Sequence, residues 1–157
     1  MDKNQAIIDY LITCPEIQDN PLYFNFIHGK EDDKQIITTS NDKATDKPYV
    51  DGSVSKLFTF TIIDFKSVAY RAIVKDGMHQ DENVEDLLQV QNIIDWISEQ
   101  NENKIFPDFG EECVIDEIST TASNPNLNGI DSNVSPALAK YSISIQVKYI
   151  DYSKAIW

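Results

Sequence analysis

The stretch that decides the fold is residues 141–149, Tyr-Ser-Ile-Ser-Ile-Gln-Val-Lys-Tyr, in which apolar and polar side chains alternate strictly. Alternation with a period of two places the apolar side chains on one face of a strand and the polar ones on the other. The pattern therefore predicts a β-strand with one buried and one solvated face, as is common in antiparallel sheets. Residues 57–65 predict a second strand, with Phe58, Phe60 and Ile62 on one face.

Shorter segments predict the rest of the sheet. Residues 22–27 are rich in aromatic side chains, and residues 35–39 are expected to be their antiparallel partner across the polar turn 29–33. Residues 113–119 predict a weaker strand. Residues 68–74 fit either a helix or a strand, and their β-branched composition favours an extended segment.

Two segments have helical spacing. Residues 83–100 form the main predicted helix, and their apolar side chains cover more than half of its circumference. That excess should be buried against the sheet and the first helix, or against a second copy of the protein. The first helix is predicted after Asp2, an N-cap with Gln5 placed as in a capping box, and should stop at Pro15.

The predicted order α-β-β-β-α-β-β indicates an α+β fold, a single mostly antiparallel β-sheet of about five strands flanked by two helices. Residues 1–157 are expected to form one domain, with long polar loops at 40–55 and 120–136 and an interaction-prone C-terminal tail, 151–157. The segment 40–55 is either a long loop or a loop with a small hairpin of its own. Connections of this length in a compact domain are usually functional or disordered. We therefore expect an interface at these segments and at Arg71. The candidate residues are Tyr49, Asp51, Arg71, Leu127, Ile130, Tyr152, Ile156 and Trp157.

The chain is strongly acidic. It has 26 acidic and 13 basic residues, for a formal net charge of -13. Such a surface repels nucleic-acid phosphates and anionic membranes, which argues against specific nucleic-acid binding. Simple solubility explains the charge, and so does a channel that must pass DNA without gripping it.

No motif for chemistry is visible in the sequence. His28 and His79 have no neighbouring cysteine or histidine that would complete a zinc pattern, and no nucleophile elbow or P-loop is present. Residues 124–129 resemble the opening of a calcium loop, but their ligands would be neutral amides, so turn formation explains them better. Cys14 and Cys113 are expected to be thiols in a reducing compartment, with a disulfide left open. We expect no enzyme, no cofactor and no metal, and find neither a secretion signal nor a membrane span.

A resemblance extends over most of the chain. It is carried by residues 83–97, by Pro107-Asp-Phe-Gly110, by Asn124-Pro-Asn126 with Gly129, and by Tyr141-Ser-Ile-Ser-Ile145 with Tyr149. These segments resemble a family of small structural proteins from tailed bacteriophages of Gram-positive bacteria, described as minor capsid or tail terminator proteins. Their shared positions are positions of the fold, so the resemblance supplies no catalytic residues.

The resemblance implies a tail-terminator-like fold and a structural role in the virion. Tail terminators form a homo-hexameric ring that caps the tail tube, ends its polymerisation and presents the head–tail joining surface. The implied partners are other copies of the chain, the tail tube protein and the connector or neck proteins. Genome DNA would pass through without specific binding, no membrane would be involved, and assembly would take place in the host bacterial cytoplasm.

Three alternatives remain open from the sequence. The chain could be another neck component, such as a head-completion or stopper protein that contacts the portal. It could be a small enzyme whose active site forms only between subunits. It could also be an acidic binding module unrelated to phages.

Overall fold

The stretch that decides the fold lies in the middle of a sheet. In the computed structural model, which describes residues 2–18, 22–24, 34–67, 82–121, 126–131 and 138–155, strand β6 (Leu138–Asp151) pairs with β3 (Val54–Ser67) on one side and with β4 (Cys113–Thr120) and β5 (Asn126–Asp131) on the other. The remaining strands are β1 (Leu22–Phe24) and β2 (Lys34–Pro48). The helices are α1 (Lys3–Leu11), α2 (Pro15–Gln18) and α3 (Glu82–Glu102).

The sheet has the order β1-β2-β3-β6-β4, with β5 also paired to β6. Every pairing is antiparallel except that of β1 with β2, which is parallel. The predicted α+β class and the mostly antiparallel sheet are therefore confirmed. The described residues form six strands instead of about five, because β5 occupies part of the predicted loop 120–136.

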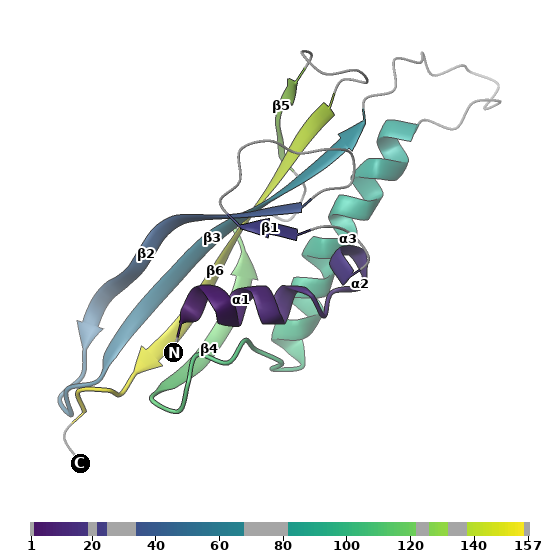
Figure 1. Ribbon diagram of the computed structural model, residues 1–157. Helices are drawn as coiled ribbons and strands as arrows, with labels where there is room; N and C mark the ends of the chain where they lie inside the picture. Colours follow the sequence, from purple (N-terminus) through teal and green to yellow (C-terminus); the bar gives the residue numbers. More distant parts are fainter. Residues whose placement is uncertain are drawn as a thin grey trace.

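One face of the sheet carries the core. Phe58, Phe60 and Ile62 of β3 are buried beside Ile145 and Val147 of β6, as the alternation predicts. Helices α1, α2 and α3 supply the opposite side of the same cluster. Figure 1 shows α3 running roughly along the strands while α1 crosses them. The helices thus cover one face of the sheet, and the other face presents polar residues such as Thr61 and Ser144, whose hydroxyl oxygens are 3.3 Å apart.

Helix α3 begins and ends close to the predicted limits. Val90, Ile93 and Ile97 are completely buried against the sheet, so the intramolecular explanation accounts for these apolar residues. Leu87 and Leu88 remain 38% and 59% exposed, so part of the apolar excess is not covered by the described part of the chain.

The N-terminal helix differs from its prediction in two details. Asp2 is the N-cap, and its carboxylate accepts a hydrogen bond from the backbone N–H of Asn4. The capping box is wrong, because the Gln5 side chain donates to Asp9 one turn later. Pro15 does not stop α1, which already ends at Leu11; it is the first residue of α2, a position where the missing N–H of proline has no cost.

The predicted loop 40–55 is wrong over most of its length. Residues 40–48 continue β2, which pairs with β3 through three register shifts, and a short turn closes the hairpin before Val54. The polar composition indicated a loop, but pairing with an apolar neighbouring strand overrides such weak preferences. The antiparallel pairing of β1 with β2 is also wrong, since residue composition marks a strand without encoding its direction. The predicted turn 29–33 and the extended segment 68–74 lie outside the described residues.

Candidate interaction surface

The β2–β3 turn presents Tyr49 and Val50 to solvent on a hydrogen-bonded backbone. The N–H of Gly52 donates to the carbonyl of Tyr49 at 3.0 Å, and the N–H of Tyr49 donates to the carbonyl of Ser53 at 2.9 Å. Asp51 accepts from both the N–H and the hydroxyl of Ser53, at 2.9 and 2.6 Å, and these bonds lower the pKa of its carboxyl. At the tip, Tyr49 is 45% exposed and Val50 is fully exposed.

The residues after β6 brace this turn. A methyl group placed on Gly52, whose φ is +91°, would lie 2.7 Å from the carbonyl oxygen of Lys154. The N–H of Tyr152 donates to the carbonyl of Glu112 at 2.7 Å, which ties the same segment to the start of β4. The turn and residues 152–155 therefore form one continuous surface at this end of the sheet, here called the turn end, which lies at the lower left of Figure 1.

Asp151 organises the base of the turn end. Its carboxylate accepts from the ammonium of Lys56 at 2.9 Å and from the N–H of Ser153 at 2.8 Å. Partial burial opposes ionisation, but the hydrogen bonds from Ser153 and the charge of Lys56 outweigh it and lower the pKa of Asp151 to about 2. The Asp151 side chain is 16% exposed and that of Lys56 is 28% exposed, so the pair is only partly screened by water.

The predicted interface residues fall into separate places. Tyr49 and Asp51, from the predicted loop 40–55, lie together with Tyr152, from the predicted C-terminal tail, at the turn end. Leu127, 51% exposed, and Ile130 belong to β5, which pairs with the opposite half of β6 and lies at the top of Figure 1. The remaining candidates lie outside the described residues; they are Arg71, Ile156 and Trp157.

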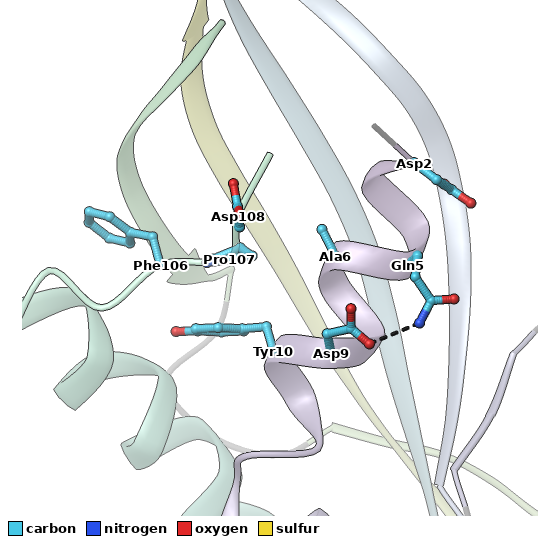
Figure 2. Close-up of a pocket in the computed structure, with 8 residues that line it drawn as sticks. All are labelled: Asp2, Gln5, Ala6, Asp9, Tyr10, Phe106, Pro107 and Asp108. Carbon is cyan, nitrogen blue, oxygen red and sulfur yellow. Dashed lines mark hydrogen bonds between the residues drawn. The ribbon is translucent and has the colours of Figure 1, made fainter. Parts of the chain in front are cut away.

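A cavity of about 420 Å³ opens between α1 and the segment that leads into β4 (Figure 2). Its floor is apolar and includes the ring of Tyr10. The hydroxyl of Tyr10 donates a hydrogen bond to the carbonyl of Ile105 at 2.8 Å. Burial raises the pKa of Tyr10 above its usual range, which is consistent with a protonated hydroxyl in this hydrogen bond. The lining residues are Asp2, Gln5, Ala6, Asp9, Tyr10, Phe106, Pro107 and Asp108.

The carboxylates around this cavity have local structural partners. Asp2 caps α1, Asp9 accepts from Gln5 at 2.9 Å, and Asp108 accepts from the N–H of Gly110 at 2.9 Å. The lining set holds no histidine, cysteine, serine or lysine. The arrangement offers an acidic rim above an apolar floor.

The sequence reading missed a buried charged pair. Asp64 and Lys66 of β3 are 1% and 3% exposed, and the Lys66 ammonium lies 3.9 Å from Asp64 and donates to Gln89 of α3 at 2.7 Å. The sequence pattern could have indicated this pair, because the alternation that buries Phe60 and Ile62 also places residues 64 and 66 on the inner face of the sheet. The pair fixes polar contacts between the sheet and α3.

Searches for known relatives did not assign a family: no family model matches the chain, and no curated protein matches it. Across the described ranges, no group of three or more histidine, cysteine, aspartate or glutamate side chains is placed to hold a metal ion. No helix in that part of the chain is both long and apolar enough to cross a membrane. Cys14 is buried, Cys113 is half-buried, and neither forms a disulfide there.

Proposed function

We propose that the protein is a tail terminator of a tailed bacteriophage, with a tail-terminator-like fold, that works as a homo-hexameric ring. The ring would cap the tail tube, end its polymerisation and present the surface for head–tail joining. The proposal combines the sequence resemblance with an architecture suited to repeated lateral contacts.

The observation that carries the proposal is exposed apolar surface at both ends of one long sheet. Val50 is fully exposed at the turn end, and Leu127 is 51% exposed on β5 at the other end. A ring that joins two larger assemblies needs one contact surface above and one below, in addition to the contacts between its subunits. Scattered apolar side chains are common on proteins, but their position at the two ends of the strands fits this requirement.

The helices leave room for the lateral contacts as well. Because α1, α2 and α3 pack on one face, the opposite face of the sheet and its outer strands are left for neighbouring subunits in the described part of the chain. The net charge of -13 suits a particle through which DNA must slide, since an acidic wall repels phosphates.

The proposal is tested by negative-stain imaging of the purified protein, alone and mixed with tail tubes. We expect hexameric rings, and tubes carrying a ring at one end. A matched comparison uses Val50→Asp, which alters only the exposed tip and should leave folding unchanged within about 0.5 kcal/mol. Loss of tube capping in this variant, with rings retained, would place the tube contact at the turn end.

Two results would count against the proposal. Density at the portal instead of the tube end would indicate a head-completion or stopper protein. A monomer at high concentration that ignores tail tubes would indicate a binding module outside the phage neck.

A further inference from the structure

Two edges of the sheet are long enough to pair with another chain, that of β2 beyond its pairing with β1 and that of the first half of β4. Strand β1 pairs with β2 only over Lys34–Ile36, so within the described residues the rest of β2, residues 37–48, has a strand neighbour on the β3 side alone. At the opposite edge, β4 pairs with β6, and the described part of the chain places no second strand beside it. The N–H of Ile118 donates to the side chain of Asn101 of α3 at 3.0 Å, so this edge is left to another strand over residues 113–117. An outer strand of this kind directs backbone N–H and C=O groups toward whatever lies next to it.

The two edges differ in charge. Strand β2 contains three lysines and two aspartates, for a net charge of +1 (Lys34, Asp42, Lys43, Asp46 and Lys47). Residues 111–117, which lead into and include the first half of β4, contain four acidic residues and no basic one (Glu111, Glu112, Asp116 and Glu117). In a chain of net charge -13, pairing the β4 edges of two copies would therefore be repulsive, whereas β4 beside β2 brings opposite charges together.

Both edges also carry features that discourage indiscriminate pairing. Register shifts interrupt β2 between Ile37 and Ser40, between Ser40 and Lys43 and before Pro48. A further register shift interrupts β4 between Ile115 and Glu117. Bulges and charged residues on outer strands are the usual protection against aggregation. An edge of opposite charge on a neighbouring copy would offset the repulsion, so pairing would be favoured with that edge and disfavoured with others.

Strand direction favours the same pair of edges. Three antiparallel pairings separate β2 from β4, those of β2 with β3, β3 with β6 and β6 with β4, so β2 and β4 run in opposite directions. Copies related by rotation about an axis along the strands keep these directions. Placing such copies side by side therefore sets β4 of one copy antiparallel to β2 of the next, in the geometry that strand pairs most often adopt.

We infer that the β2 edge of one copy pairs with the β4 edge of the next, so that the sheet continues from subunit to subunit. This inference rests on the proposed ring and names the surfaces that close it. The contact is heterologous, with two different surfaces of each subunit, which is the kind of contact that generates rings and does not stop at a dimer.

Charge reversal tests the inference. One variant carries Lys43→Glu and Lys47→Glu on β2, and the other carries Glu112→Lys and Asp116→Lys beside and on β4. We expect each variant alone to need at least about tenfold more protein to form rings, measured by light scattering and negative-stain imaging, because like charges face each other across the contact. A matched control reverses two exposed charges on α3, Glu99→Lys with Glu102→Lys, and should assemble like the wild type.

Mixing the two variants provides the decisive measurement. Each reversed edge then meets its opposite on the other variant, so we expect rings to return, with the two variants alternating in equal numbers by native mass spectrometry. Hydrogen exchange should show new protection of the backbone in residues 37–48 and 113–117 when rings form, because the Ile118 N–H is already bonded within the subunit.

The outcomes separate this inference from the proposed function. Wild-type rings that persist unchanged in both single variants would overturn the edge pairing and leave the tail terminator proposal standing. A wild-type protein that forms no ring, with or without tubes, would overturn both. If the variants lose their rings and their circular dichroism spectra also change, the mixture distinguishes misfolding from a lost contact. Rings that return in the mixture show that both variants are folded, and rings that stay absent count against the edge pairing.

Discussion

Replacing Asp151 with asparagine removes one charge at the base of the turn end and leaves the shape of the side chain unchanged. The asparagine oxygen can still accept from the N–H of Ser153, but as a neutral group, so the change weakens the bonds from Ser153 and removes the attraction to Lys56. Lowering the pKa from 3.8 to about 2 corresponds to roughly 2.5 kcal/mol of stabilisation. Because both side chains keep some contact with water, screening reduces the expected loss to about 1–2 kcal/mol.

The sign of the pH dependence follows from the direction of the pKa shift. The carboxyl of Asp151 ionises more readily in the folded protein than in the unfolded chain, so its stabilisation is complete well above the unfolded value of 3.8. It disappears as the pH falls through the folded value of about 2. The difference between wild type and Asp151→Asn should therefore be largest near neutral pH and fall to about half near pH 3.

Urea denaturation followed by circular dichroism measures this difference. We expect the midpoint of Asp151→Asn to lie about 0.5–1 M below that of the wild type near pH 7. Asp116→Asn, an exposed substitution on β4, serves as the control and should change the stability by less than about 0.5 kcal/mol. Equal midpoints for the two variants, or a difference that stays constant down to about pH 3, would refute the role assigned to Asp151.

Two further substitutions test the packing around the candidate surface. Gly52→Ala should lower the free energy of unfolding by about 1–3 kcal/mol, because the left-handed backbone and the Lys154 carbonyl both oppose a side chain at this position. A melting temperature equal to that of the wild type would contradict this expectation. Tyr10→Phe should lower the free energy of unfolding in urea by about 1–2 kcal/mol, because the Ile105 carbonyl loses its donor. Tyr49→Phe at the exposed tip should be nearly neutral. Equal effects of the two substitutions would argue against a stabilising Tyr10–Ile105 hydrogen bond.

The parts of the fold that the sequence predicted are those with strong periodicity. The core strands β3 and β6 and helix α3 have apolar residues at regular spacing, and their burial follows that spacing closely. The polar continuation of β2 and the short strand β5 have no such pattern, because their pairing depends on neighbouring strands distant in the sequence. A sequence window cannot contain that information.

The candidate surface was predicted only in part. Tyr49 and Asp51 were singled out, but the fully exposed Val50 between them was not, and the grouping of Tyr152 with them depends on strand pairing. The dipeptide Asp51-Gly52 is a known signal of a tight hairpin turn and would have shortened the predicted loop. The whole-chain charge gave no indication that the two outer strands differ in sign, because the average hides the local contrast.

The central position of β6 has a consequence for how the chain folds. Thr61 and Ser144 face each other across the β3–β6 pairing although 83 residues separate them, so bringing them together costs about 4 kcal/mol of chain entropy before any contact repays it. Since β6 joins the β2–β3 hairpin to β4 and β5, neither half of the sheet has its central partner until residues 138–151 have been synthesised. Folding should therefore be slow for a chain of this size, and the outer strands stay exposed to wrong partners in the meantime.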